Sequence, residues 1–182
     1  MEHRIQKWIG KTLAQASKMI LNKDTLANLA TYQMSCFMLP KKITNKRDAI
    51  QRDFWWGKET NNKGYYPASY SCLCKPIHKG GLGFRDAHKF NLALIAKLSW
   101  RILKEPKALW VSQLRPKYFR KTSSFRANIP TSSSWIWKCT YKGIKLVEQN
   151  NIWEIGEGKK VNIWEDNWIP DLEENLKNYK TT

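Results

Sequence analysis

The chain has 182 residues, which is enough for one domain with a real core. Its formal net charge is +17, and residues 1–150 hold 28 Lys and Arg against 8 Asp and Glu, whereas residues 151–182 hold 4 against 7. This basic body suits a polyanion such as RNA or DNA, although a solvated basic surface is the plainer alternative. Ten tryptophans argue for an ordered core, and four dispersed cysteines exclude a disulfide framework.

Two helices are predicted before Pro40. Apolar residues at helical spacing predict an amphipathic helix over residues 4–22, with its stripe in the core. Asn22–Asp24 interrupts it, and Asp24 is a plausible N-cap for a second helix over residues 25–38. The core stripe of the first helix is Ile5, Trp8, Ile9, Thr12, Ala16, Met19 and Ile20.

A third, strongly basic helix is predicted over residues 43–54. Ile43, Ile50 and Phe54 would form its inner face. If the first third of the chain grips a nucleic-acid backbone, this helix is the predicted place. Its candidate binding residues are Lys42, Lys46, Arg47 and Arg52.

A polar loop over residues 57–71 follows and carries Tyr65, Tyr66 and Tyr70. These rings either stack on bases or pack on the preceding Trp55–Trp56 pair, and we favour packing. The run Gly80–Gly83 lacks the spacing of a phosphate loop and is expected to supply positive φ angles in a turn.

The most buried helix is predicted over residues 87–103, with Asp86 as its N-cap. Its stripe is Phe90, Leu94, Leu98 and Ile102, widened by Ala93, Ala96 and Trp100. Lys97 and Arg101 share one edge, where they either face a phosphate or extend around Trp100.

A short helix is predicted from Pro106 to the residue before Pro116. The next residues interleave cations with aromatic rings, as nucleic-acid surfaces do. The candidate binding residues in this run are Lys117, Tyr118, Arg120 and Lys121.

The last two predicted elements lie beyond an exposed loop at residues 122–134. Ser134 or a neighbour is expected to cap a helix that holds Trp135, Cys139 and Ile144. The alternating run from Ile152 to Trp164 around a glycine turn predicts a β-hairpin.

No catalytic or metal-binding residues are predicted. The basic body lacks the paired carboxylates that hold two metal ions in a polymerase, and the three histidines show no metal spacing. Cys72, Cys74 and His78 lack an evident fourth ligand. No cofactor is expected. No apolar run reaches about 18 residues, so no membrane contact is expected either, and the predicted location is the nucleus or cytoplasm.

Three blocks of residues carry a family resemblance. The central block opens with Phe-Trp-Trp-Gly at residues 54–57, passes Cys-Lys-Pro at 74–76 and Gly-Gly-Leu-Gly-Phe at 80–84, and closes at 91–101. Residues 14–40 and 153–170 provide the flanking blocks. In this order they resemble reverse transcriptases of plant non-LTR (LINE-type) retroelements, which are often labelled ribonuclease H proteins.

The resemblance implies a helical thumb or connector between the polymerase palm and the zinc-binding-type and RNase H regions. The expected fold is mainly α, a bundle with a small C-terminal β-hairpin. The expected function is that of a non-catalytic fragment, not an enzyme, which binds RNA or DNA without sequence specificity and pairs with the rest of a reverse transcriptase. The alternative is a structural or protein-interaction remnant of a truncated transposon reading frame. The expected divisions are 1–56, 57–86, 87–149, 150–170 and an acidic flexible tail at 171–182.

Overall fold

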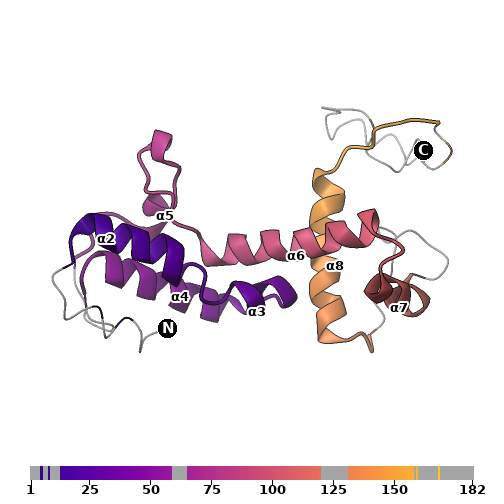
Figure 1. The fold of residues 1–182 in the computed structure, drawn as a ribbon, viewed down its shortest axis with the longest axis horizontal. Helices are drawn as coiled ribbons and strands as arrows, with labels where there is room; N and C mark the ends of the chain where they lie inside the picture. Colours follow the sequence, from indigo (N-terminus) through magenta and orange to yellow (C-terminus); the bar gives the residue numbers. More distant parts are fainter. Residues whose placement is uncertain are drawn as a thin grey trace, which may run out of the picture.

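The computed structural model describes residues 5, 8, 13–58, 65–119, 131–157, 159 and 168. Within these residues all regular elements are helices, so the mainly α prediction is confirmed for them. A long helix, α6 (Ala87–Lys104), runs between two groups of helices (Figure 1). The first group consists of α2 (Gln15–Ile20), α3 (Thr31–Cys36) and α4 (Lys41–Trp55), and the second of α7 (Leu109–Tyr118) and α8 (Trp135–Asn150).

The first group closes around an apolar core between α4 and the chain that precedes it. Ile5, Leu26, Ile50 and Phe54 are buried there, and Trp8 packs against Phe54 with ring centroids 6.1 Å apart. Ile43, predicted for the inner face of α4, is exposed, and Thr44 is buried in its place. The helix itself was predicted two residues short at its start and one at its end.

The predicted break at Asn22–Asp24 is wrong. These residues lie inside a π-helix, η1 (Leu21–Leu26), that continues directly from α2. Asn22 is buried there, and its side-chain Nδ2 donates a hydrogen bond of 3.1 Å to the Gln51 carbonyl of α4. The chain turns at residues 27–30 instead, before α3. The predicted helix 4–22 is also interrupted, because Leu13 and Ala14 are not helical.

Between α4 and α6 the chain forms a short projection made of α5 (Tyr70–Leu73), η2 (Ile77–Lys79) and a glycine turn (Figure 1). Gly80 and Gly83 have φ angles of +77° and +68°, which confirms the expected turn. A Cβ on Gly81 would lie 2.0 Å from the Lys75 carbonyl oxygen, so the turn closes on its own backbone. Tyr70 packs in an aromatic cluster with Trp55 and Phe84, which favours packing over base stacking for this ring.

The length of α6 was predicted to within one residue, but the face of the helix that is buried differs from the predicted one. Asp86 caps the helix as expected, because its carboxylate accepts a hydrogen bond of 2.8 Å from the Lys89 amide. The buried residues are Ala87, Asn91, Ile95, Ser99 and Ile102, whereas Phe90, Leu94 and Leu98 are half-buried. The helix therefore turns two polar side chains inward, and each of them serves another helix.

Asn91 ends α3. Its Nδ2 donates to the carbonyls of Met34 and Phe37, at 2.7 and 2.8 Å, and its Oδ1 accepts from the Leu39 amide at 2.7 Å. Both amide hydrogens and one lone pair of the oxygen of this fully buried side chain are thus bonded to the backbone at the end of one helix.

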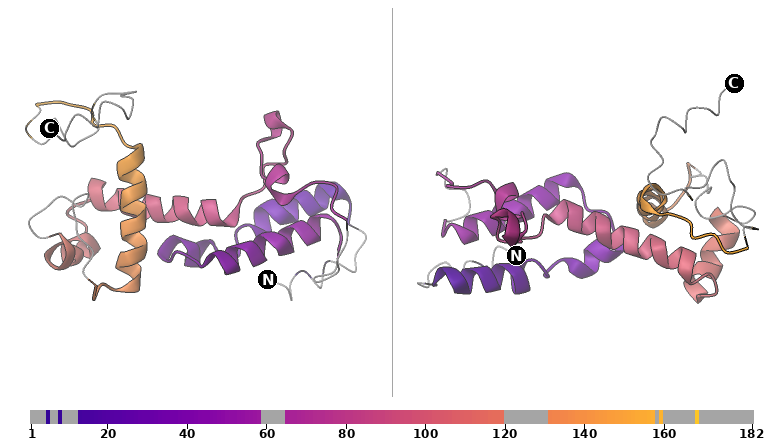
Figure 2. Two further views of the ribbon diagram at one scale, coloured as in Figure 1. Left: turned by 180° about the vertical axis from the view of Figure 1, so that it is seen from behind. Right: turned by 90° about the horizontal axis from the view of Figure 1, so that it is seen from above.

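The helices α6 and α8 cross each other (Figure 2), and they make closest contact at Ser99 and Gly143. The Ser99 hydroxyl lies 2.9 Å from the Ile95 carbonyl of its own helix and 2.8 Å from the Thr140 carbonyl of α8. A Cβ on Gly143 would lie 2.3 Å from Ser99 Oγ and 2.7 Å from the Ile95 oxygen. Glycine is therefore the residue that permits this close approach. Ser134 caps α8 as predicted, accepting from the Trp137 amide.

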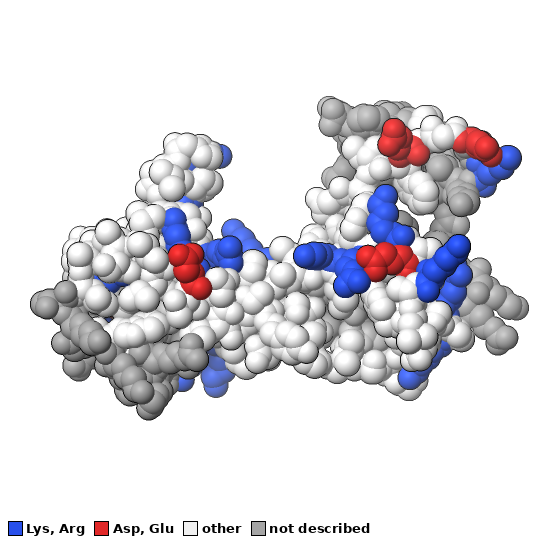
Figure 3. All heavy atoms as spheres, viewed as in Figure 1, with Lys and Arg blue, Asp and Glu red and all other residues white. Residues whose placement is uncertain are grey.

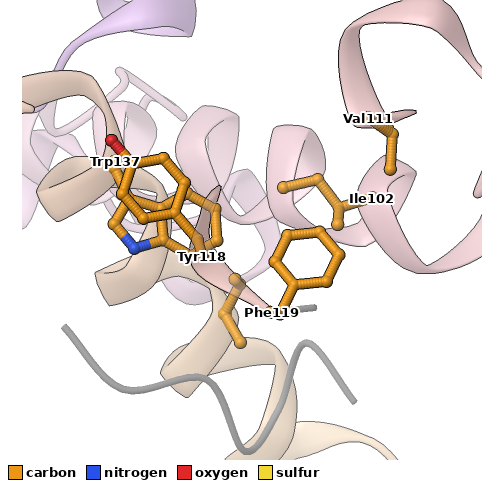
Figure 4. Close-up of a cluster of buried hydrophobic side chains, with 6 residues drawn as sticks. Ile102, Val111, Tyr118, Phe119 and Trp137 are labelled. Atoms are coloured by element: carbon orange, nitrogen blue, oxygen red, sulfur yellow. The ribbon is translucent and has the colours of Figure 1, made fainter. Parts of the chain in front are cut away.

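The second group has its own core, centred on Trp137 (Figure 4). The Tyr118 ring stacks on the Trp137 indole, with centroids 4.3 Å apart and planes 6° apart, and Phe119 lies 5.8 Å away. The prediction that α7 ends before Pro116 is wrong, since the helix runs through Pro116 to Tyr118. Pro116 offers no amide hydrogen to the Ser112 carbonyl one turn earlier, and the stacking of Tyr118 on Trp137 anchors the turn that carries this loss.

The predicted C-terminal β-hairpin is not supported. Its first arm, residues 152–155, forms no strand, and Ile152 and Ile155 are exposed. The predicted second arm, residues 161–164, and the acidic tail lie outside the described residues.

Candidate nucleic-acid interface

The surface that best fits a polyanion is the outer face of α6. Because an α-helix turns about 100° per residue, positions opposite the buried stripe fall within an arc of roughly 120°. All of these positions are exposed, and four of the six carry a cation. We call this set the α6 ridge: Lys89, Ala93, Lys97, Trp100, Arg101 and Lys104.

Most cations of the ridge are not neutralised. Arg101 forms an ion pair of 2.9 Å with Glu105, and its guanidinium carbon lies 5.9 Å from the Trp110 ring centroid. The Lys104 ammonium lies 5.1 Å from the centroid of the Trp100 ring. In the part of the chain that the structure describes, no carboxylate forms an ion pair with Lys89, Lys97 or Lys104.

The predicted residues of α4 do not form one surface. Lys42 and Lys46 are exposed, but Arg47 is buried, with only 7 % of its surface accessible. Its guanidinium donates to the Leu26 and Ala27 carbonyls, and to Met34 Sδ, so it satisfies the end of η1 and faces away from solvent. Burial lowers the pKa of this guanidinium.

Arg52 is only partly available. It pairs with the Asp53 carboxylate at 2.9 Å, and its guanidinium carbon lies 4.1 Å from the Tyr66 ring centroid. The Lys58 ammonium lies 4.0 Å from the same centroid, and the Tyr66 hydroxyl donates to Asp53. Tyr66 is therefore engaged by this charge cluster, whereas Tyr65 is exposed.

Of the four predicted residues after Pro116, the structure describes two. Lys117 is exposed, whereas Tyr118 is buried in the stack on Trp137 and offers no ring face to a base. Arg120 and Lys121 lie outside the described residues. Of the ten predicted residues, the structure thus brings Lys97 and Arg101 together on one helix edge, and places Lys42 and Lys46 on another.

Four members of the ridge were missed by sequence reasoning. Ala93 and Trp100 were assigned to the apolar stripe, and the cations Lys89 and Lys104 were not considered. Their spacing relative to Lys97, eight residues before and seven after, was the signal available, since both steps return to one helix face.

The molecule is hollowed above the middle of α6, between the α5 projection and the C-terminal half of α8 (Figure 3). Lys and Arg atoms lie on both slopes of this saddle, beside smaller areas of Asp and Glu atoms. A backbone lying along α6 would therefore meet positive charge on either side.

A separate small cavity of about 160 Å³ lies between η1, α4 and the turn before α6. Lys23 and Arg85 line it together with Asp24, so both signs of charge meet there, and the Arg85 guanidinium already donates to the Asn28 side chain at 3.0 Å. This mixture does not favour an anion over a neutral ligand.

Metal and thiol chemistry have little support in the described residues. None of them form a group of three or more His, Cys, Asp or Glu suited to a metal ion. Burial raises the pKa of the Cys74 thiol to about 12, so it is not a thiolate at neutral pH. Within the same residues, no helix has the length and hydropathy needed to cross a membrane.

Two curated proteins of Arabidopsis thaliana are similar to this chain. One, named "Putative ribonuclease H protein", is 34 % identical over 169 residues, which cover 91 % of this chain and 27 % of that protein. The other, named as an uncharacterized mitochondrial protein, is 36 % identical over 144 residues, which cover 79 % of this chain and 94 % of that protein. The chain thus spans little more than a quarter of the first relative. No family model matches, and no solved structure is similar.

Proposed function

The chain belongs to the family of the uncharacterized mitochondrial protein of Arabidopsis thaliana, and from this membership and the α6 ridge we propose that it is a retroelement-derived protein that binds nucleic-acid backbone without sequence specificity. Similarity to a much longer protein named for ribonuclease H supports the retroelement origin. In this proposal the chain corresponds to the helical segment after a polymerase palm, and it binds without catalysing. The sequence contains no Tyr-x-Asp-Asp run in its basic body.

The observation that carries the binding proposal is the ridge itself. Lys89 and Lys104 lie 15 residues apart on one helix, a rise of about 22 Å. Asn91 and Ser99 tie the opposite face of α6 to α3 and α8, so the ridge is held on a fixed support. A row of cations on such a support releases counterions from a phosphate backbone without first ordering a loop.

The ridge explains why no base sequence would be selected. Lysine ammonium groups act as point charges toward phosphate oxygens, which carry no sequence information. Because Arg101 is paired with Glu105, three lysines are available, and three phosphate contacts predict a log–log salt slope of about −2.7 for duplex DNA and about −2.1 for a single strand. Cations outside the ridge would add to both values.

The test is fluorescence anisotropy with a labelled duplex and a labelled single strand, titrated at several salt concentrations. We compare the double variant Lys97→Glu/Lys104→Glu with the double variant Lys138→Glu/Lys142→Glu, which makes the same charge change on exposed positions of α8. The ridge variant should lose at least about tenfold more affinity, and the magnitude of its salt slope should fall by about 1.4 for a single strand and about 1.8 for a duplex. Equal losses would show that net charge alone drives binding, and salt-independent binding would contradict the proposal altogether.

A second candidate function, protein interaction, is favoured by apolar side chains on the second helix group. Leu109, Trp135 and Ile136 are 77 %, 60 % and 52 % exposed. Apolar surface of this kind is typical of a site that another protein covers. Light scattering of the purified chain tests it, since the variant Trp135→Ser/Ile136→Ser should abolish any concentration-dependent association while leaving nucleic-acid binding unchanged.

The name of the second relative places that protein in the mitochondrion. For this chain the nucleus or cytoplasm stays a prediction, as do the residue divisions and the partnership with the rest of a reverse transcriptase.

A further inference from the structure

We infer that the α6 ridge prefers single-stranded nucleic acid, with Trp100 as the platform on which one base stacks. This inference rests on the proposed function, because it names the ligand class of the same ridge. Neither the charge nor the sequence resemblance distinguishes a single strand from a duplex. The position of one large aromatic ring among the cations does.

Trp100 is 42 % exposed, whereas Trp55 and Trp137 are buried in the two aromatic clusters. It lies on α6 opposite the buried stripe, and among the described residues no other aromatic ring packs against it. Leaving this much indole in water forgoes part of the free energy that its burial would supply. The ring belongs to none of the three buried apolar clusters of the described residues.

The neighbours of Trp100 suit a nucleotide. Lys97 and Lys104 are three residues before it and four after, so both adjoin it on the helix surface. The rises to them are about 4.5 and 6 Å, in opposite directions along the helix. A base stacked on the indole would therefore have a cation on each side for its flanking phosphates. The Lys104 ammonium lies over the ring, 5.1 Å from its centroid, so a base that stacks on this face displaces the ammonium toward the flanking phosphate.

A single strand and a duplex differ in what they offer this ring. In a duplex, the faces of the bases are stacked on one another, so Trp100 can contact only the backbone. In a single strand, the bases can turn outward and stack on an aromatic side chain, and every base has a face to offer. The contact favours single strands without selecting a sequence, which agrees with a ridge that reads only phosphates.

The test compares the variants Trp100→Ala and Trp100→Phe with the unmodified chain. The ligands are an oligothymidylate and a mixed-sequence duplex of equal length, at one fixed salt concentration. Trp100→Ala should weaken binding of the single strand by about 5- to 100-fold and of the duplex by less than twofold, and Trp100→Phe should retain most of the affinity because it keeps a ring. The far-ultraviolet circular dichroism of both variants should match that of the unmodified chain, since the side chain is not part of a core.

The outcomes separate this inference from the proposed function. If Lys97→Glu/Lys104→Glu weakens both ligands while Trp100→Ala changes neither, the ridge binds backbone and the stacking role is refuted. Equal weakening of strand and duplex by Trp100→Ala also refutes it, because a general loss of the surface then explains the result. If Lys97→Glu/Lys104→Glu alters the affinity for neither ligand, the proposed function is refuted. Oligothymidylate should quench the tryptophan fluorescence of the unmodified chain, and this quenching should be smaller in Trp100→Phe. Such a difference would independently place the base at this ring.

Discussion

Replacement of Asn91 by leucine should be among the most damaging single changes in the chain. The amide makes three hydrogen bonds of 2.7 to 2.8 Å to backbone groups at Met34, Phe37 and Leu39, and none of its surface is accessible. Leucine has a similar size but leaves one amide hydrogen and two carbonyl oxygens without this partner. Each buried, unsatisfied polar group costs about 1–3 kcal/mol. Partial access of water on the Phe37 and Leu39 side reduces the sum, so we expect a loss of about 3–5 kcal/mol.

Urea unfolding followed by circular dichroism measures this loss, with the slope checked for a shared two-state transition. The matched control is Asn150→Leu, which removes one exposed hydrogen bond from Nδ2 to the Leu146 carbonyl at the end of α8. The control should change the free energy of unfolding by less than about 0.5 kcal/mol. If Asn91→Leu is as mild as the control, the three bonds do not hold α3 to α6, and the support of the ridge must be sought elsewhere.

Three further changes test the fold. Gly143→Ala should destabilise the chain by about 2–3 kcal/mol, because the added Cβ would lie 2.3 Å from Ser99 Oγ at the α6–α8 crossing. The control Gly156→Ala, whose Cβ would have no neighbour within 4 Å, should leave the free energy of unfolding unchanged in the same urea assay. Equal effects of the two variants would contradict the close crossing. Ser134→Ala should cost about 1 kcal/mol by removing the cap of α8, and no measurable loss would count against that cap. Burial raises the pKa of Asp48 to about 6, so the folded chain keeps a proton that the unfolded chain loses near pH 4. The free energy of unfolding should therefore decrease as the pH rises from about 4 to about 6. Asp48→Asn should remove that part of the slope in unfolding measurements across this range, and an unchanged slope would refute the assignment.

The elements that local chemistry defines were predictable from the sequence. α4 and α6 were expected close to their observed bounds, the start of α8 was expected after Ser134, and the caps Asp86 and Ser134 were expected by residue type. Such signals act within one turn of helix, so a sequence shows them directly. The glycine turn before α6 belongs with them, since positive φ favours glycine whatever surrounds it.

What the sequence did not reveal depends on contacts between distant residues. The stripe of α6 was placed on its apolar residues, yet Asn91 and Ser99 are buried because α3 and α8 present backbone groups to them. Arg47 was counted as a surface cation, but the carbonyls at the end of η1 draw it inward. Tyr118 looked like a stacking residue, and it does stack, on Trp137. In each case the partner that decides where the side chain lies comes from a distant part of the sequence.

These displaced residues sharpen the electrostatic argument for the ridge. A count of cations overstates the usable charge, since Arg47 caps a helix end and Arg52 and Arg101 are paired with carboxylates. The salt slope of the whole chain will still include cations such as Lys138 and Lys142 on α8, so its absolute value does not identify a surface. The difference in slope between the two double variants does, because both change the charge equally and only one changes it on α6.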